Sequence, residues 1–137
     1  MSFSAIVVAA GSGTRSGGPK QWRMLAGKPV IRWSVEALLE AGATQVIVVI
    51  PAGGEAQADL CLTGLSGWRA VVGGAQRADS VRRGLSSVEA DLPVLVHDAA
   101  RPLLSGATIQ NLLKAVERVP AAAPALSVAD TLKSAID

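Results

Sequence analysis

The sequence predicts an α/β fold, a three-layer sandwich with a mostly parallel sheet, and two observations carry this prediction. Short apolar segments with the Val and Ile content of buried strands recur along the chain, and segments with helical spacing of apolar residues separate them. Three of the strand-like segments also end directly in glycines or charged residues. Strands that alternate with helices of this length form right-handed βαβ units, so helices are expected on both faces of the sheet.

The length and composition favour one domain. The chain has 137 residues, half of them hydrophobic, which is enough to bury a real core, so we expect residues 1–137 to form a single domain. The formal net charge is only +2, and the aromatic residues are three Trp and one Phe. Because nucleic-acid binding uses strong positive charge and aromatic stacking, we expect no nucleic-acid partner.

The location of the protein is predicted from its single cysteine and its short apolar segments. Cys61 has no second cysteine to pair with, which excludes a disulfide or a cysteine-based metal site within the chain and favours a buried thiol in a reducing cytosol. The first apolar segment is too short for a signal peptide, and no stretch approaches the length of a membrane span. We therefore expect a soluble, cytoplasmic protein with no membrane partner.

The first strand is predicted over residues 5–10 and runs into a loop with glycines at positions 11, 13, 17 and 18. Consecutive N–H groups of a glycine loop can converge on an anion. Arg15 and Lys20 lie in and just after this loop, whereas the first acidic residue of the chain is Glu36. A glycine loop with two cations and no nearby carboxylate indicates a binding site for a polyphosphate.

Two better-known phosphate loops do not fit. The dinucleotide fingerprint G-x-G-x-x-G has Ser16 in place of its third glycine, and no acidic residue ends the second predicted strand. The nucleoside-triphosphatase loop needs Gly-Lys followed by Ser or Thr, but the Gly27-Lys28 pair precedes Pro29. A plain strand-to-helix turn stays open as an alternative, although it leaves five cations within residues 15–32 without a role.

The first helix is predicted after a short connection over residues 21–27. Pro29 suits its first turn, and Gly42 suits its end. Trp33 is expected to pack this helix against the sheet rather than to serve as a ligand platform. The apolar stripe of the helix is Val30, Trp33, Ala37, Leu38 and Leu39, with Val35 fitting less well.

Strands and helices continue to alternate after this helix. Further helices are expected from about Glu55 to Leu62, from Arg77 onward with Asp79 or Ser80 near the first turn, and over residues 105–119. Further strands are predicted over residues 45–51, 68–72, 93–97 and 121–128, the last in spite of its alanines, which have low β propensity.

The chemically distinctive segments are predicted to meet at one edge of the sheet. Ligands of parallel α/β sheets bind at the carboxyl ends of the strands. Residues 11–20, 73–80 and 98–101 each follow a predicted strand and carry glycines, cations or a carboxylate. Three such loops at one edge make a binding site much better supported than any single loop does.

The motifs in these loops resemble a known family. Residues 9–15, together with Pro19-Lys20-Gln21, resemble the signature loop of nucleotidyltransferases that activate sugars and sugar-like alcohols. Residues 77–81, 97–102 and 130–133 narrow the resemblance to the 2-C-methyl-D-erythritol 4-phosphate cytidylyltransferases of non-mevalonate isoprenoid synthesis. The resemblance covers essentially the whole chain and implies a Rossmann-like nucleotidyltransferase sheet.

The resemblance also implies a reaction and its residues. A phosphate oxygen of methylerythritol phosphate would attack the α-phosphorus of CTP, with Mg²⁺ as cofactor and pyrophosphate as leaving group, in a homodimeric enzyme. Arg15 and Lys20 match the pair that stabilises the transition state, Asp98 matches the Mg²⁺ ligand, and Asp98, Arg101 and Thr131 match acceptor-binding positions. The positions matched to nucleotide binding are Ala9, Ala10, Gly11, Gly13, Arg15, Lys20, Gly74, Ser80, Asp98 and Ala99.

Several alternatives stay open at this point. Asp98 could be a turn or cap carboxylate and Arg101 a partner in a surface ion pair, while His97 is interpreted as structural. Other candidate functions are a sugar-1-phosphate pyrophosphorylase, a molybdopterin nucleotidyltransferase, or a nucleotide-binding fragment without activity.

The sequence departs from the family pattern in two respects. The interval from Arg15 to Lys20 is shorter than usual and holds Ser16 where the family has an apolar residue. The family also continues beyond the position of Asp137 with segments that complete the acceptor site. We therefore expect the 137-residue chain to be a C-terminally truncated nucleotidyltransferase domain that binds CTP weakly, self-associates and is inactive alone.

Overall fold

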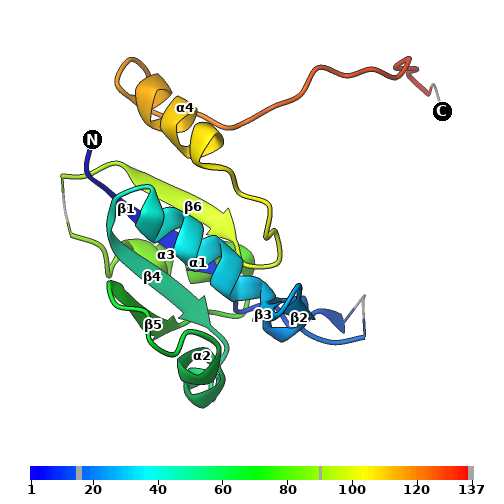
Figure 1. Ribbon diagram of the computed structural model, residues 1–137. Coiled ribbons are helices and arrows are strands. Elements are labelled where there is room, and N and C mark those ends of the chain that lie inside the picture. Colours follow the sequence, from blue (N-terminus) through cyan, green and yellow to red (C-terminus); the bar gives the residue numbers. More distant parts are fainter. Residues whose placement is uncertain (15–16, 90, 136–137) are drawn as a thin grey trace.

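The computed structural model describes residues 1–14, 17–89 and 91–135. At its centre is a four-stranded sheet in the order β5-β4-β1-β6 (Figure 1). Every neighbouring pair in this sheet is parallel. The chain proceeds from β1 through β4 to β5 and then crosses back to β6, so the strand order reverses between β1 and β6. The four strands are Phe3–Val8 (β1), Ala43–Ile50 (β4), Trp68–Val72 (β5) and Val94–Asp98 (β6).

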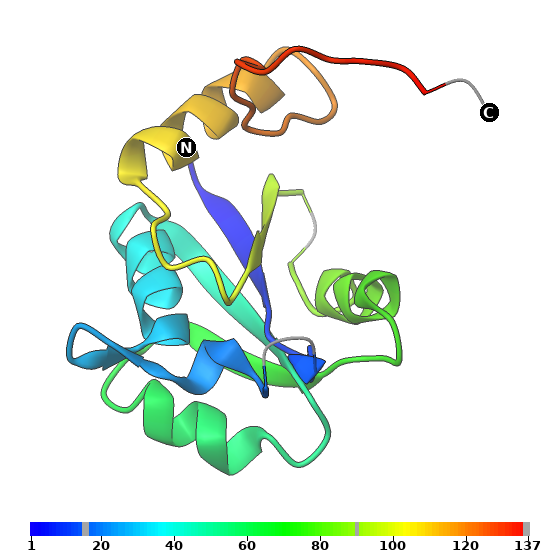
Figure 2. The ribbon, with the colours of Figure 1, turned by 90° about the vertical axis from the view of Figure 1, so that its right-hand side faces the viewer.

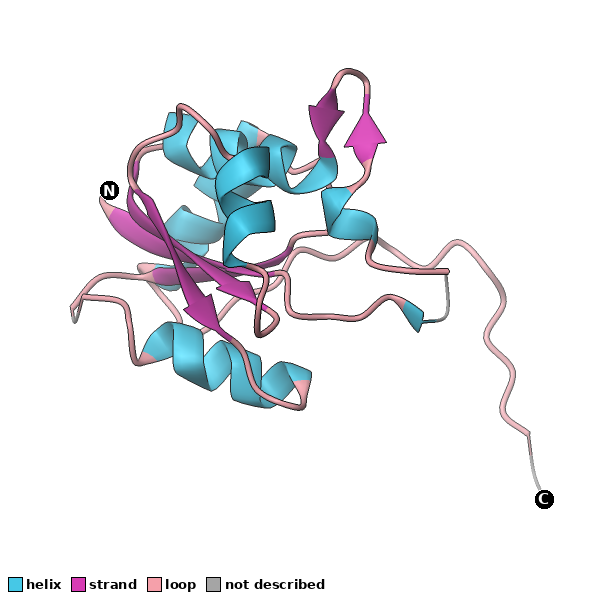
Figure 3. Ribbon diagram, turned by 90° about the horizontal axis from the view of Figure 1, so that it is seen from below, coloured by secondary structure: helices cyan, strands magenta, loops and turns pink. Residues whose placement is uncertain are grey.

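Helices cover both faces of this sheet, which confirms the predicted α/β sandwich of three layers (Figures 2 and 3). Side chains of α1, α2 and α4 join one buried apolar cluster, whereas α3 contacts β1 and β4 from the opposite face. Switching faces where the chain reverses is what right-handed crossovers require. The helices are Val30–Glu40 (α1), Glu55–Cys61 (α2), Arg77–Leu85 (α3) and Gly106–Val116 (α4).

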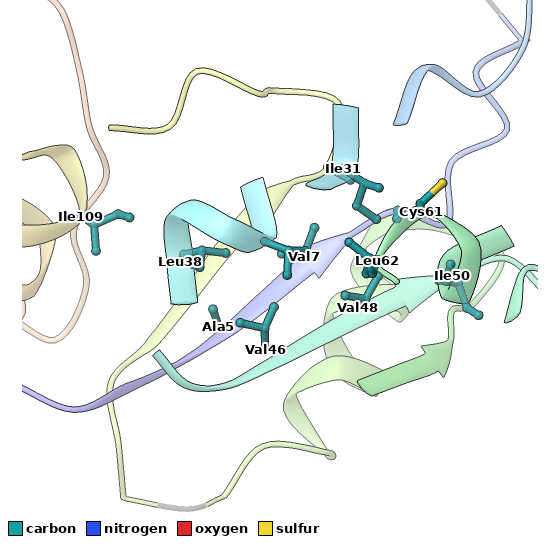
Figure 4. Close-up of a cluster of buried hydrophobic side chains, with 14 of the residues drawn as sticks. Ala5, Val7, Ile31, Leu38, Val46, Val48, Ile50, Cys61, Leu62 and Ile109 are labelled. Atoms are coloured by element: carbon teal, nitrogen blue, oxygen red, sulfur yellow. The ribbon is translucent and has the colours of Figure 1, made fainter. Parts of the chain in front are cut away.

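The two faces of the sheet are filled by alternate residues of the central strands. Ala5 and Val7 of β1, with Val46, Val48 and Ile50 of β4, are fully buried on the face of α1 and α2 (Figure 4). Residues between them, including Ile6, Ile47 and Val49, form a second cluster on the other face. Burial of both faces explains why these strands are continuous apolar runs rather than alternating patterns.

Helix α3 lies very close to the sheet because Gly84 has no side chain. A Cβ atom at Gly84 would lie 2.7 Å from Cγ2 of Ile6, closer than real Cβ contacts allow. Gly84 itself is buried. The close approach fixes the position of α3, whose first turn follows the loop after β5.

The buried face of α1 differs from the predicted stripe. The buried residues are Ile31, Ser34, Val35 and Leu38, which follow the i, i+3, i+4, i+7 spacing of a single helix face. The predicted stripe was correct at Val35 and Leu38, but Val30, Trp33 and Ala37 are only partly buried. The prediction missed Ile31 and Ser34. Ser34 is polar, and its hydroxyl has hydrogen-bond partners at His97 and Arg101.

A short hairpin occupies the segment that was predicted as a plain connection. Lys20–Trp22 forms a 3₁₀ turn, and β2 (Met24–Leu25) pairs antiparallel with β3 (Lys28–Pro29). Trp33 donates its indole N–H to the carbonyl oxygen of Leu25 at 2.9 Å, and Nζ of Lys28 lies 4.3 Å from the centroid of its ring. Trp33 therefore holds the hairpin on α1, and the prediction that it packs against the sheet was wrong.

Glu36 ties the same hairpin to α1 through two cations. Its carboxylate accepts a hydrogen bond from Nζ of Lys28 at 2.5 Å and from Nε of Arg32 at 2.7 Å. Burial alone would raise the pKa of Glu36, but the hydrogen bonds from Lys28 and Arg32 outweigh it and lower the pKa. Glu36 is therefore charged and paired with one cation of the hairpin and one of α1.

The other elements agree with the prediction except near the end of the chain. β5 has the predicted bounds, α3 begins at Arg77 with Asp79 in its first turn, and the thiol of Cys61 is buried. Residues 121–128, predicted as a strand, are exposed and form none, as the segment runs away from the sheet (Figure 1). Their alanines and Pro124 give little β propensity and remove a ladder donor. Within the described ranges, every helix is too short or too polar to cross a bilayer.

Candidate functional site

A cleft of about 900 Å³ opens at the carboxyl ends of β1, β5 and β6, beside the point where the strand order reverses. Crevices at this position are where open α/β sheets bind ligands. Its described lining comes from all three loops that the sequence predicted. The lining residues are Val8, Ala9, Ala10, Gly11, Ser12, Gly13, Thr14, Lys20, Gln21, Gly74, Ala75, Gln76, Arg77, Ser80, Asp98, Ala100 and Arg101.

The first wall is the glycine loop after β1. Gly13 has φ +62°, and a Cβ there would collide with the carbonyl of Gly18, whose N–H donates to the Gly13 oxygen at 3.0 Å. Only glycine suits both the left-handed backbone and this close approach. Beyond the loop, Lys20 begins the 3₁₀ turn and exposes its side chain at the cleft. Arg15, the predicted partner of Lys20, lies outside the described residues.

The second wall lies between β5 and α3. The hydroxyl of Ser80, on α3, is buried and accepts a hydrogen bond from the N–H of Gly74 at 3.2 Å. A Cβ at Gly74 would collide with Asp79, so the segment after β5 packs directly on the first turn of α3. The contacts of Gly74 with Ser80 and Asp79 hold this segment against α3, so that Gly74 and Ser80 line one side of the cleft.

The third wall begins at Asp98, the last residue of β6. Oδ1 of Asp98 accepts hydrogen bonds from Nη2 and Nε of Arg77 at 2.9 and 3.2 Å. Oδ2 lies 3.3 Å from Nε of Arg101. The carboxylate therefore sits between two guanidinium groups, one from the second wall and one from the turn after β6.

His97 supports the turn that carries Asp98 and Arg101. Nε2 of His97 lies 2.8 Å from the carbonyl oxygen of Arg101, which also accepts a hydrogen bond from the hydroxyl of Ser34 at 3.2 Å. Burial lowers the pKa of His97, although the Arg101 carbonyl opposes this shift. The geometry agrees with the structural interpretation of His97.

Most of the predicted site residues that the structure describes come together in this cleft, but Ala99 and Thr131 do not line it. Ala99 packs in the apolar core, and its N–H donates to the oxygen of Val8 at 3.0 Å. Thr131 is exposed in the segment that leads away from α4, and Arg15 is not described. The predicted residues that line the cleft are Ala9, Ala10, Gly11, Gly13, Lys20, Gly74, Ser80, Asp98 and Arg101.

Arg77 and Gln21 are among the lining residues that were assigned no role from the sequence. Both belong to motifs that carry the family resemblance, Arg77 to residues 77–81 and Gln21 to Pro19-Lys20-Gln21, and the place of Arg77 at the predicted sheet edge was the signal that pointed to the cleft. Gln21 follows Lys20 and is buried, with its amide bonded to carbonyl oxygens of the glycine loop. No local pattern reveals a buried glutamine, because its partners lie 10 and 12 residues away in the sequence.

The charges of the cleft suit a polyanion. The described lining contains the cations Lys20, Arg77 and Arg101 against the single carboxylate of Asp98. Cations around a glycine loop in a concave site attract phosphate groups strongly, since field lines concentrate in such clefts. The fold and the charges of the cleft are typical of α/β proteins that bind phosphorylated, nucleotide-type ligands.

Solved structures specify this class further. The chain superposes on a nucleotidyl transferase from Methanothermobacter thermautotroptrophicus with a TM-score of 0.71 and 28% identity, covering 82% of this chain and 56% of that one. It superposes on 4-diphosphocytidyl-2C-methyl-D-erythritolsynthase from Anaerococcus prevotii DSM 20548 with a TM-score of 0.73 and 26% identity, covering 85% and 51%. The class is that of the nucleotidyltransferases.

Within this class, the sequence assigns the family. Residues 3–137 match the family model of IspD, 2-C-methyl-D-erythritol 4-phosphate cytidylyltransferase, and the chain belongs to this family. It is 55% identical over 138 aligned residues to the bifunctional enzyme IspD/IspF of Caulobacter vibrioides (strain NA1000 / CB15N), with 97% of this chain aligned. The chain spans 36% of the length of that relative.

Proposed function

We propose that this chain carries the CTP site of an enzyme that transfers a cytidylyl group from CTP to 2-C-methyl-D-erythritol 4-phosphate and releases pyrophosphate, in isoprenoid precursor synthesis. One observation carries the proposal: a glycine loop and three cations of a chain in this family surround one cleft at the switch point of the sheet. Residues 1–137 would form one nucleotidyltransferase domain.

The cations provide what this chemistry requires. Transfer of a nucleotidyl group depends mainly on in-line positioning and on neutralising charge at the phosphate oxygens. Lys20 lies at the open end of the glycine loop, and Arg77 and Arg101 lie on the facing walls. In the proposed reaction Lys20 stabilises the transition state together with Arg15, and the two other cations hold the triphosphate and the acceptor.

The proposed base site is the wall formed by Gly74 and Ser80. The contact between the Gly74 N–H and the Ser80 hydroxyl brings small groups against the cleft. Such a surface reads the edge of a base through backbone and hydroxyl groups and needs no aromatic platform. This supports a pyrimidine nucleotide, whose phosphates would contact the backbone of Ala9, Ala10, Gly11 and Gly13. The assignment of Ala99 to nucleotide binding rests on the family resemblance alone.

The donor set of the cleft fits a nucleotide-bound Mg²⁺ rather than a metal held by protein alone. Among the described residues no group of three or more His, Cys, Asp or Glu side chains gathers, and Asp98 is the carboxylate in the cleft. Mg²⁺ commonly takes one or two carboxylates with phosphate oxygens, so Asp98 would hold it. When bound, the ion neutralises charge on the phosphate groups.

The acceptor site and the assembly extend the proposal. Asp98 and Arg101 lie together at the end of β6, which supports a role for both in binding methylerythritol phosphate. The same role for Thr131 rests on the family motif alone. A homodimer and a cytoplasmic location are also proposed from the resemblance, and sedimentation and cell fractionation test them.

Nucleotide selectivity tests the proposed function directly. Calorimetric titration of the chain with CTP, UTP, GTP and ATP, each with Mg²⁺, should give the tightest binding for CTP and much less heat for ATP. Formation of the cytidylylated product from CTP and methylerythritol phosphate is then expected in the full-length enzyme. An equal response to CTP and ATP would assign the site to another nucleotidyltransferase, and binding without turnover would make it a nucleotide-binding protein.

A further inference from the structure

The side chain of Gln21 is a buried polar group that the proposed reaction does not use directly. It is only 5% exposed and follows Lys20 in the 3₁₀ turn. Its amide nitrogen lies 2.7 Å from the carbonyl oxygen of Ala9 and 3.1 Å from that of Gly11. Because an amide nitrogen carries two hydrogens, one side chain can donate to both of these loop carbonyls.

These two hydrogen bonds fix the orientation of two peptide groups. In a trans peptide the C=O and the next N–H point in opposite directions, and no cis peptide occurs among the described residues. When Gln21 holds the carbonyls of Ala9 and Gly11, it turns the N–H groups of Ala10 and Ser12 to the other side. Both of these residues line the cleft.

We propose that Gln21 is a positioning residue that presents the N–H groups of Ala10 and Ser12 to phosphate oxygens. The far part of the loop is closed by backbone, through the bond from Gly18 to Gly13, so Gln21 supplies the corresponding restraint at the base of the loop. It also joins the loop to its neighbour Lys20. Donors that are oriented before the ligand arrives bind an anion without the cost of reorganising the loop.

The inference rests on the proposed function only in taking the ligand to be a polyphosphate. Inorganic tripolyphosphate is therefore the probe, with cytidine as the probe that lacks phosphate. The test variant is Gln21→Met, which keeps the length of the side chain but removes its donors. The matched control is Gln57→Met, at an exposed glutamine of α2 outside the cleft.

Two measurements define the expected result. Tripolyphosphate binding should weaken by at least about tenfold in Gln21→Met, as for lost hydrogen bonds to a charged group, and stay unchanged in Gln57→Met. In NMR spectra the amide resonances of Ala10 and Ser12 should shift with tripolyphosphate in the unmodified chain and not in Gln21→Met. Cytidine binding should be the same in all three proteins.

Gln21→Glu is a second test variant, which tests the inference even if Gln21→Met does not fold. Its carboxylate cannot donate to the two carbonyls, but its protonated form donates one hydrogen bond. Tripolyphosphate binding by Gln21→Glu, relative to the unmodified chain at each pH, should therefore improve as the pH is lowered. A role in folding alone would not produce this pH-dependent rescue of phosphate affinity in a folded variant.

Several results would overturn the inference. These are no tripolyphosphate binding by the unmodified chain, binding without shifts at Ala10 and Ser12, or equal weakening of tripolyphosphate and cytidine. Unchanged binding by a folded Gln21→Met or Gln21→Glu would overturn it as well. Tripolyphosphate binding that depends on Gln21, together with no preference for CTP over ATP, would instead support this inference and contradict only the proposed function.

Discussion

Arg77 reaches from the first turn of α3 to Asp98 at the end of β6, and its Nη2 lies 2.9 Å from Oδ1 of that carboxylate. The contact joins two walls of the cleft that are 21 residues apart in the sequence. Arg101 pairs with the other carboxylate oxygen, so Asp98 lies between the guanidinium groups of Arg77 and Arg101. This arrangement makes distinct predictions for the arginine and for the carboxylate.

Replacing Arg77 should weaken binding of the triphosphate. Arg77→Ala removes a cation from the cleft, so the affinity for CTP should fall by about tenfold or more, as for a lost charge-assisted hydrogen bond. Arg82→Ala is the control, because Arg82 is on the same helix but pairs with Asp79 outside the cleft. Calorimetry on both variants checks this. Equal affinities would assign Arg77 to an ion pair without a role in binding.

Replacing Asp98 should act through the metal. Asp98→Asn keeps the shape of the side chain but removes its charge, so the gain in CTP affinity on adding Mg²⁺ should largely disappear. Binding without Mg²⁺ should survive or improve, because Arg77 and Arg101 lose a competing carboxylate. Titrations with Mg²⁺ and with EDTA separate the two effects. If Mg²⁺ tightens CTP equally in both proteins, Asp98 is a turn residue that orients arginines.

Loss of Lys20 should affect turnover more than binding. In the full-length enzyme, Lys20→Ala should lower kcat by a factor on the order of a hundred or more, as for one preorganised charge donor. Lys114→Ala, at an exposed lysine of α4, is the control and should leave kcat unchanged. Steady-state kinetics with CTP and methylerythritol phosphate measure this. A raised KM with normal kcat would remove Lys20 from the transition state.

Glu36 predicts an acid-dependent contribution to stability. The pKa of Glu36 is lower in the folded chain than in the unfolded chain. Its contribution to the free energy of unfolding is therefore present above a pH of about 4.5. The contribution is lost as the pH falls through the folded pKa. Glu36→Gln should therefore lower the free energy of unfolding by about 1–2 kcal/mol at pH 7, with the difference shrinking below pH of about 4.5. Urea unfolding across pH tests this.

The control for Glu36 is Glu40→Gln, an exposed residue on the same helix. Its unfolding curve should follow that of the unmodified chain at every pH. A Glu36→Gln variant that is as stable as the Glu40→Gln variant at neutral pH would show that the hairpin is held without the ion pairs.

A methyl group on α3 should separate the helix from the sheet. Gly84→Ala places Cβ against Ile6 and should lower the free energy of unfolding by about 1–3 kcal/mol, as overpacked cores do. Gly106→Ala, at the start of α4, meets no atom within 4 Å and should be neutral or stabilising by up to about 1 kcal/mol. Denaturant unfolding compares them. Equal stability would mean that α3 shifts freely on the sheet.

The architecture could be predicted because its main elements are locally consistent. β1 and β4 are mostly apolar and rich in β-branched residues, and helix α1 between them has its buried residues at helical spacing. The hairpin over residues 24–29 could not be predicted, since it has only two residues per strand and depends on Trp33 and Glu36 of α1. Ser34 misled the helix pattern because its burial depends on partners 63 and 67 residues away.

The site was predictable at the level of loops but not of contacts. Glycines and charges that follow strands indicated which segments would meet, and strand order brought them together. The pairing of Asp98 with Arg77 depends on the crossover from β5 to β6, and the bonds of Gln21 depend on the fold of the loop. Ala99 also shows that a residue beside a site can lie on the core side of the chain.

The reversal of strand order has a consequence for how this site can be redesigned. The glycine loop, the turn before α3 and the turn after β6 are encoded by three separate stretches, each anchored by its own strand. A chimera in which the stretch around Gly74 is exchanged could therefore bind a nucleotide with a different base, while the glycine loop proposed to hold the phosphates stays unchanged. An exchange that includes Arg77 must also supply a matching residue for Asp98, because this ion pair links the stretch before α3 to the stretch after β6.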